Sequence, residues 1–361
     1  MPVITHAEVY LIDLEVETVR TDALQTFVKQ ETIFVDIRTD DGGEGTGYSY
    51  TIGTGGTAVL ALLRDYLMPR LAGRDPRRVE AVWRELFLAT KATTVGAITS
   101  LALAAVDTAL WDWRCRAAGQ PLWMLAGGAK DRIPLYDTEG GWLHLTIDEL
   151  VAGATASQKA GWPGIKMKVG RSPAQDAERL GAVRAAVGGD FDVMLDANQS
   201  LTAPDAIRRA RLLEPYDPFW FEEPLPAEDV AGHEAVAAAT SIPVAVGESM
   251  YSAGQFAEYV RRNAAGVIQV DVARIGGITP WLKVAHLAEA ANLTVCPHFL
   301  MELHVSLCCA VPNSRYLEHI PQLRAITHGE IEIVDGQAVA PRHPGLGIDW
   351  DRDAIDDRRT H

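Results

Sequence analysis

Ionisable residues recur at a regular interval in the second half of the chain. Each follows a short apolar run, and successive members lie 20 to 28 residues apart. They are Lys168, Asp196, Glu222, Glu248, Asp271, His298 and Glu318. Because this interval matches one strand plus one helix, the pattern predicts a titratable group at the end of each strand of a repeated βα fold. Carboxylates, ammonium groups and an imidazole gathered in this way could bind a metal and move protons.

Three consecutive members of this series are carboxylates: Asp196, Glu222 and Glu248. If they converge, their mutual repulsion raises their pKa values unless a cation lies among them. Hard oxygen ligands with no His or Cys partner suit Mg²⁺, with water and substrate oxygens completing an octahedron. Asn198 points to the same side of the strand as Asp196 and is a candidate for binding a ligand of the metal.

Two lysines stand one residue apart in the apolar run GIKMKVG, residues 164 to 170. Residues i and i+2 of a strand share a face, so Lys166 and Lys168 point into a barrel while Met167 points outward. An ammonium group near a divalent cation and a second ammonium group is driven toward its neutral form, which a general base needs. We expect Lys166 to hold charge and Lys168 to move a proton. The alternative, that both lysines only balance the carboxylates, stays open.

Asp271 and His298 end successive predicted strands and are expected to pair, which gives a second acid/base group. If burial keeps Glu318, in RYLEHI, neutral, it could donate a hydrogen bond to a substrate carboxylate oxygen. Its alternative is a salt bridge to an arginine. Taken alone, each of these residues is more often a helix cap or a structural group. The register of seven in a row favours function.

The first third of the chain must carry a different architecture. Two apolar alternating segments, TIFVDIRT and GTGYSYT, flank the turn-rich DDGGEG at 40 to 45, which predicts a hairpin. Helical patterns follow over 56 to 71, 77 to 89 and 96 to 118. Strands followed by helices predict an α+β domain over residues 1 to 125.

From Arg132 onward, short apolar runs alternate with amphipathic helical patterns. This alternation predicts a parallel sheet covered on both faces, and about seven units favour a barrel of the α/β class. The alternation of strands and helices does not exclude an open doubly wound sheet, which is the alternative fold. We expect the barrel over residues 126 to 325 and a C-terminal segment, 326 to 361, that returns to the first domain. In a barrel, the strand ends meet at one face, where such enzymes build their active sites.

The composition narrows the classes of partner. A formal net charge of −15 argues against nucleic acid or an anionic membrane as partner. No apolar stretch reaches 18 residues and the amino terminus has no signal-peptide pattern, so we expect a cytoplasmic protein. The four cysteines show no CxxC spacing and are expected to be reduced and buried.

Lys-x-Lys, three carboxylates on successive strands, an Asp/His pair and a final Glu together resemble the mandelate racemase subgroup of the enolase superfamily. The resemblance implies a (β/α)7β-type TIM barrel with an α+β capping domain formed by the N-terminal region and the C-terminal tail. It implies that Asp196, Glu222 and Glu248 bind Mg²⁺, that Lys168 and the Asp271–His298 pair are the bases, and that Lys166 and Glu318 stabilise an enolate formed from a carboxylate substrate. It also implies a homo-oligomer of even number, often an octamer.

The segments YDTEGGW, KMK, DANQS and PHFLMELH look most like the acid-sugar dehydratases of the subgroup, of the talarate/galactarate type. The resemblance therefore implies Mg²⁺-dependent dehydration of an aldarate or aldonate to a 2-keto-3-deoxy acid sugar. The runner-up is a racemase or epimerase of a 2-hydroxy acid.

Substrate hydroxyls need polar partners, and the polar segment ETVRTDALQTFVKQ supplies candidates in Arg20, Thr21, Asp22 and Gln25. Tyr48 and Thr138 are further candidates. A solvated surface loop is the alternative for the segment. Two other classes of protein remain as rivals: a Schiff-base aldolase, which would also use a strand lysine, and a binding protein that has kept the fold.

Overall fold

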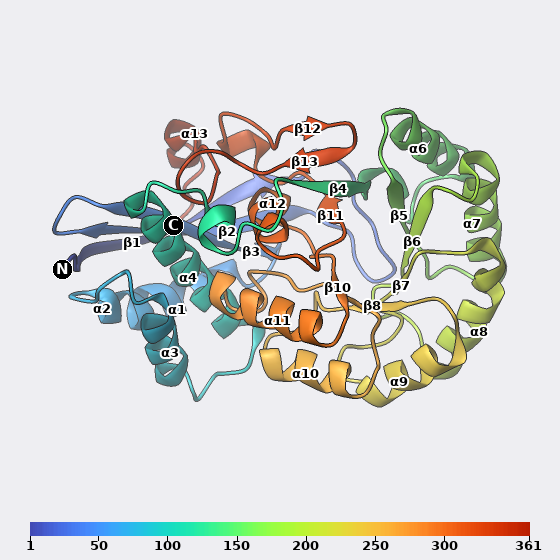
Figure 1. Cartoon of the computed structure of the whole chain (residues 1–361), viewed down its shortest axis with the longest axis horizontal. Helices are drawn as coiled ribbons and strands as arrows, with labels where there is room; N and C mark the ends of the chain where they lie inside the picture. The colour runs from blue at the N-terminus through green and yellow to red at the C-terminus, as the bar shows by residue number, and fades with distance from the viewer.

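A three-stranded antiparallel sheet forms the first part of the computed structural model, which describes residues 1 to 361 (Figure 1). Its strands are β1 (Ile4–Glu15), β2 (Lys29–Thr39) and β3 (Glu44–Ile52), in the order β1-β2-β3. The turn between β2 and β3 lies where the sequence predicts a hairpin, and Phe34 of β2 is paired with Tyr48 of β3.

Five helices follow this sheet. They are α1 (Gly56–Leu62), α2 (Met68–Leu71), α3 (Val79–Ala89), α4 (Ala97–Ala117) and α5 (Leu122–Leu125), and a π-helical turn joins α1 to α2. Of these, α1, α2 and α4 pack on the strands, while α3 and α5 pack on α4. The long helix α4 is buried along most of its length and packs directly on β3. This close approach requires glycine in β3, because a Cβ on Gly47 would overlap the carbonyl oxygen of Ala105.

Eight parallel strands and seven helices form the barrel, with the helices on the outside (Figure 1). The strands are β4 (Arg132–Asp137), β5 (Gly164–Lys168), β6 (Asp192–Asp196), β7 (Phe221–Glu222), β8 (Val244–Val246), β9 (Val267–Ile268), β10 (Thr294–Val295) and β11 (Leu317–His319). The helices are α6 (Ile147–Lys159), α7 (Pro173–Val187), α8 (Ala203–Leu213), α9 (Val230–Ala239), α10 (Ala253–Arg261), α11 (Ile278–Ala290) and α12 (Met301–Ala310).

The ring of strands is closed. β11 pairs in parallel with β4, and a bridge between Val295 and Ser314 joins the β10 side to the chain leading into β11. The (β/α)7β barrel is therefore confirmed, and the open doubly wound alternative is wrong. Large apolar side chains, including Tyr136, Trp220 and Tyr316, fill the inside of the ring.

The C-terminal segment contacts both the barrel and the first domain. β12 (Ile333–Val334) and β13 (Gln337–Val339) form a hairpin, and β13 pairs antiparallel with Arg132–Pro134 of β4. That half of β4 is available because its partners in the barrel pair only with residues 135 to 137. After α13 (Arg352–Asp356), the chain reaches the first sheet, where Leu11 exchanges backbone hydrogen bonds with Thr360 and His361. The tail therefore pairs with β4 of the barrel before it reaches the first domain.

All four cysteines are buried and unpaired, as predicted. No helix is both long enough and apolar enough to cross a membrane.

The connection between β1 and β2, residues 16 to 28, lies over the carboxyl end of the barrel. The carbonyl of Thr21 accepts a hydrogen bond of 3.0 Å from the backbone of Leu143, and the Thr21 hydroxyl lies 2.8 Å from Nδ1 of His144. The tip is folded on itself, because Asp22 Oδ1 accepts from the backbone N–H groups of Leu24 and Gln25. We call residues 16 to 28 the capping loop.

Candidate active site

The ionisable residues of the repeated pattern meet at the carboxyl end of the barrel. Lys168, Asp196 and Glu222 are the last residues of β5, β6 and β7, and they lie side by side in the strand register. The others follow β8, β9 and β10 or lie within β11. One pocket is lined by nine of the predicted site residues: Asp22, Gln25, Thr138, Lys166, Lys168, Asn198, Glu248, His298 and Glu318.

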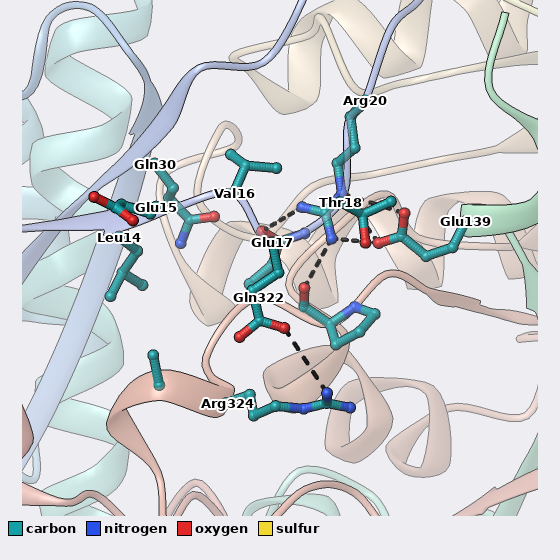
Figure 2. Close-up of a pocket in the computed structure, with 12 residues that line it drawn as sticks. Leu14, Glu15, Val16, Glu17, Thr18, Arg20, Gln30, Glu139, Gln322 and Arg324 are labelled. Atoms are coloured by element: carbon teal, nitrogen blue, oxygen red, sulfur yellow. Dashed lines mark hydrogen bonds and ion pairs between the residues drawn. The ribbon is translucent and has the colours of Figure 1, made fainter. Parts of the chain in front are cut away.

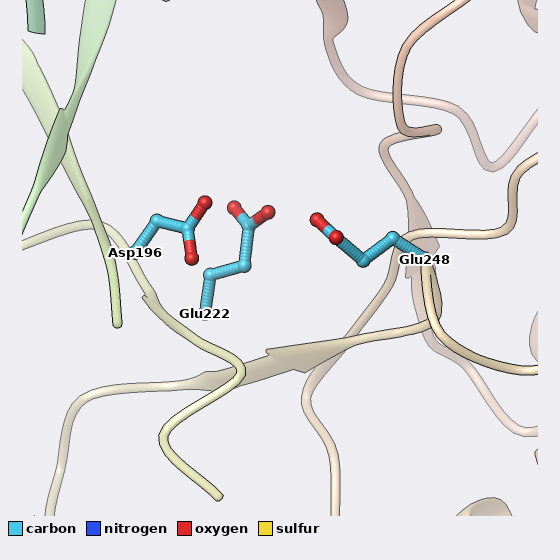
Figure 3. A group of neighbouring side chains, drawn as sticks. All are labelled: Asp196, Glu222 and Glu248. Carbon is cyan, nitrogen blue, oxygen red and sulfur yellow. The ribbon is translucent and has the colours of Figure 1, made fainter. Parts of the chain in front are cut away.

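Asp196, Glu222 and Glu248 point toward one another from three neighbouring strands (Figure 3). Each offers one carboxylate oxygen, and these oxygens all lie within 4.8 Å of one another. Oxygen ligands of an octahedral Mg²⁺ lie about 3 to 4 Å apart, so a small contraction would suit this ion. Burial, followed by the charge of Asp196, raises the pKa of Glu222 to about 7. A cation would relieve that cost, so the three residues fit Mg²⁺ chemically and geometrically.

Asn198 lies beside these carboxylates with its side chain buried. Its backbone N–H donates to Asp196 Oδ1 at 2.9 Å, while its own Oδ1 has no hydrogen-bond partner. Asn198 also has a positive φ of 43°, a conformation that asparagine tolerates better than most residues. The site therefore holds a free acceptor next to the three carboxylates.

The two lysines have different partners. Nζ of Lys166 lies 2.8 Å from Glu318, 3.0 Å from Glu222 and 3.6 Å from Asp196. Lys168 is paired with Asp196, and its Nζ lies 5.3 Å from the centre of the Trp142 ring. Burial lowers the pKa of Lys168, but the charges of Asp196, Glu222 and Glu248 together outweigh burial and hold the pKa above its ordinary value. The neutral form expected for a base therefore requires a divalent cation to take up the charge of Asp196.

Asp271 and His298 form the predicted pair, with 2.9 Å between Asp271 Oδ2 and His298 Nδ1. On its other side, His298 Nε2 lies 3.4 Å from Glu248. Burial lowers the pKa of His298, but Glu248 and then Asp271 outweigh burial, so the pKa is raised overall. This arrangement favours an imidazolium that can donate a proton.

Glu318 differs from its expectation. It accepts hydrogen bonds of 2.8 Å from the Thr138 hydroxyl and the Phe299 backbone, and it forms an ion pair with Lys166. Burial raises its pKa, but Lys166 and then His298 lower it far below the ordinary value. These contacts favour a charged Glu318 that accepts hydrogen bonds, the opposite of the neutral, donating form considered from the sequence, and its role in the reaction stays a prediction. The partner of the salt bridge is a lysine and not an arginine.

Arg20 does not line the pocket that contains Lys168 and His298. Its guanidinium donates to Glu139 at 3.0 Å, to Gln322 at 3.1 Å and to the carbonyl of Pro321 at 3.0 Å (Figure 2). It borders a separate polar cavity of about 170 Å³. The interpretation of Arg20 as a substrate ligand is corrected, because its donors are already used to fasten the capping loop to the barrel.

Tyr48 is also absent from the pocket. Its ring is buried in the first domain, 5.3 Å from Trp350 and 6.2 Å from Phe34 between ring centres. Its hydroxyl has no hydrogen-bond partner. The structure therefore gives Tyr48 a packing position and no route to a substrate.

Six residues that line the pocket were not among the candidates from the sequence. They are Phe27, Ile52, Trp142, Arg274, Phe299 and Ile320. Asp22 and Gln25 of the capping loop were candidates and do line it. Trp142 belongs to the segment YDTEGGW, as Thr138 does, so the sequence offered a reason to consider it as a pocket residue. Arg274 follows Asp271 by three residues, and no motif in the sequence indicated that it would line the pocket.

Two family models cover most of the chain. The model described as "Mandelate racemase / muconate lactonizing enzyme, N-terminal domain" matches residues 7–127, and "Enolase C-terminal domain-like" matches residues 149–354. The L-talarate/galactarate dehydratase of Salmonella typhimurium is 37% identical over 318 residues, which are 88% of this chain and 79% of that protein. The 3,6-anhydro-alpha-L-galactonate cycloisomerase of Streptomyces coelicolor is 36% identical over 320 residues, 88% of each chain.

Solved structures agree with this match. The structure of the Salmonella dehydratase liganded with Mg and L-lyxarohydroxamate has a TM-score of 0.95 at 34% identity, covering 100% of this chain and 93% of that one. The L-talarate dehydratase from Polaromonas, complexed with Mg and L-glucarate, has a TM-score of 0.95 at 37% identity, covering 100% and 98%. The chain therefore belongs to the enolase superfamily, in its mandelate racemase and muconate lactonizing enzyme family.

Proposed function

We propose that this chain is a Mg²⁺-dependent dehydratase of an acid sugar, an aldarate or aldonate of the talarate/galactarate kind. The observation that carries the proposal is that Lys168 on β5 and His298 after β10, which can serve as acid/base groups, lie in one pocket beside three carboxylates that could hold a metal ion. The names of similar proteins support the choice of substrate class, since they include dehydratases of talarate, galactarate and galactonate.

Asp196, Glu222 and Glu248 would hold the Mg²⁺, with Asn198 beside them. When bound, the ion would act as a Lewis acid that stabilises negative charge on the substrate carboxylate. Lys166 lies between these ligands and Glu318, so its ammonium group adds a fixed positive charge at the same place. Thr138 and the Phe299 backbone hold Glu318 in position.

The reaction moves one proton off the substrate and one onto its leaving group. Lys168 takes the proton from the carbon next to the carboxylate, and the electron pair of that C–H bond forms an enolate. The C–O bond at the next carbon then breaks, and His298 donates a proton so that the hydroxyl leaves as water. The enol that results rearranges to a 2-keto-3-deoxy acid. Asp271 keeps Nδ1 of His298 occupied, which leaves Nε2 to face the pocket.

The second candidate is a racemase or epimerase of a 2-hydroxy acid. Its support is that β5 and β10 are separated around the ring by β4 and β11, so Lys168 and His298 approach the pocket from different sides. Two bases on different sides suit removal and return of the same proton.

Incubating the enzyme and Mg²⁺ with a library of acid sugars in D₂O separates the two candidates. Dehydration yields a keto acid, detected as its semicarbazone and by mass. Deuterium incorporation next to the carboxylate without loss of water would contradict the dehydratase and favour the epimerase. Activity that survives EDTA and is trapped by borohydride would instead indicate a Schiff-base aldolase.

The cytoplasmic location and the homo-oligomeric, octameric assembly stay predictions. So does a small-molecule carboxylate as the partner of this chain.

A further inference from the structure

Tyr50 links the first domain to the acid/base pair of the barrel. It lies on β3, near the end of the strand, and its side chain is buried. Its hydroxyl donates to Asp271 Oδ2 at 2.6 Å, the same oxygen that lies 2.9 Å from His298 Nδ1. A residue of the capping domain therefore shares one carboxylate oxygen with the imidazole.

The remaining contacts fix the direction of this hydrogen bond. Arg274 donates from Nε to the Tyr50 oxygen at 3.2 Å, so the single hydroxyl hydrogen of Tyr50 is left to point at Asp271. Arg274 is itself held by donating from Nη1 to the carbonyl of Glu248 at 3.0 Å. The other oxygen of Asp271 accepts from the backbone N–H groups of Ala273 and Arg274 at 2.8 and 3.0 Å.

The ring of Tyr50 also contacts the imidazole indirectly, through the ring of Phe299. Its centre lies 4.7 Å from that of Phe299, and the Phe299 ring is stacked on His298 at 5.3 Å and 15°. Lys168 has no part in this arrangement, since its contacts are Asp196 and Trp142.

We propose that Tyr50 is a positioning residue that fixes the Asp271 carboxylate, and through it the plane of the His298 imidazole, while leaving Lys168 untouched. The capping domain thereby sets the geometry of one of the two acid/base groups. This proposal rests on one part of the proposed function, namely that the enzyme removes the proton from the carbon next to the substrate carboxylate.

The test compares Tyr50→Phe with Tyr48→Phe, two variants that each remove one buried hydroxyl from the same strand. Tyr48 is the matched control because its hydroxyl has no partner. Exchange of the proton in D₂O is followed by NMR for two substrates that differ in configuration at that carbon, so that each reports one base. Tyr50→Phe should slow exchange through His298 about 10- to 100-fold, mainly in kcat, as expected for loss of a group that orients a histidine. Exchange through Lys168 should stay within about twofold of wild type.

A crystal structure of Tyr50→Phe provides a readout that needs no turnover. It should show the Asp271 carboxylate rotated or the His298 ring displaced, with the position of Lys168 unchanged. Equal loss on both faces, or no change in rate together with an unmoved imidazole, would overturn the proposal. Failure of the wild type to dehydrate any acid sugar while it still exchanges the proton would contradict the proposed function but not the role of Tyr50.

Discussion

Asp107 of α4 caps a helix that belongs to the barrel. Its Oδ2 accepts from the backbone N–H of Thr279 at 2.8 Å, and its Oδ1 accepts from the Thr279 hydroxyl at 2.7 Å. Thr279 lies in the first turn of α11, whose own N-cap residue is Gly277 and supplies no side chain. A Cβ on Gly277 would overlap the Asp107 carboxylate. Glycine at this position therefore leaves room for a side chain of the first domain to cap a barrel helix.

This cap predicts a pH-dependent contribution to stability. Burial raises the pKa of Asp107 from 3.8 to about 7, against the lowering effect of the hydrogen bonds from Thr279. Between these two values the folded state binds more protons at Asp107 than the unfolded state, so its contribution to the free energy of unfolding falls as pH rises. The slope is at most about 1.4 kcal/mol per pH unit. In Asp107→Asn this pH dependence should be absent. Denaturant unfolding of the wild type and the variant at pH 5 and 7.5 measures the difference in their free energies of unfolding. A difference between the two that does not change with pH would contradict the prediction.

Arg20 should control substrate binding more than chemistry. Arg20→Ala leaves Glu139 with one donor from Trp142 and frees the capping loop, which carries Asp22 and Gln25 into the pocket. We expect KM to rise about 10-fold or more, because breaking one side of a largely buried charge pair costs a few kcal/mol, while kcat falls less. Steady-state kinetics measure the split. Arg324→Ala is the control, since Arg324 and Glu17 are exposed and 3.8 Å apart, and it should change KM less than about twofold. A loss confined to kcat would show that the loop does not act through binding.

Removal of the metal should abolish activity and lower stability. Chelation leaves three carboxylates in mutual repulsion, so activity should vanish with EDTA and return with Mg²⁺. Mg²⁺ at 100 times its Kd should stabilise the fold by about 2.7 kcal/mol, seen as a higher thermal midpoint. Glu222→Gln should weaken Mg²⁺ binding in calorimetry, whereas Glu214→Gln, a substitution outside the pocket, should not. Full turnover in EDTA would refute the metal assignment.

His298→Asn should separate the two faces of the substrate. Without the imidazole, exchange through His298 should fall by at least about 100-fold, whereas the substrate of opposite configuration should still exchange through Lys168. Lys168→Ala should give the reverse pattern. Proton exchange in D₂O measures both, and equal loss for both substrates in either variant would show that the two groups do not act separately.

The barrel and the positions of its strand-end residues could be predicted because both follow from local spacing. Lys166 and Lys168 share a face in any strand, and the interval of one βα unit brings residues such as Asp196 and Glu222 to one end of the sheet. The roles of partners far apart in sequence could not be predicted in this way. Arg20 meets Glu139 across 119 residues, and the charge state of Glu318 depends on Lys166 lying 2.8 Å away.

Tyr48 and Tyr50 show, within one strand, that contacts with distant segments cannot be predicted from local spacing. Both face the same side of β3, so alternation cannot tell them apart. Tyr48 is covered by Trp350 from the end of the chain, while Tyr50 lies where β3 meets the barrel and reaches Asp271. The difference lies in which distant segment packs over each ring.

Because Leu11 pairs with Thr360, the outer edge of β1 stays uncovered until synthesis of the chain is almost finished. These residues are 349 apart, so at about 5 to 20 residues per second β1 leaves the ribosome roughly 20 to 70 s before its outer partner. During that interval an edge rich in Val, Leu and Ile presents free N–H and C=O groups, which are a template for pairing with other nascent chains. The three acidic residues of β1, Glu8, Asp13 and Glu15, should disfavour such pairing until residues 359 to 361 cover the edge.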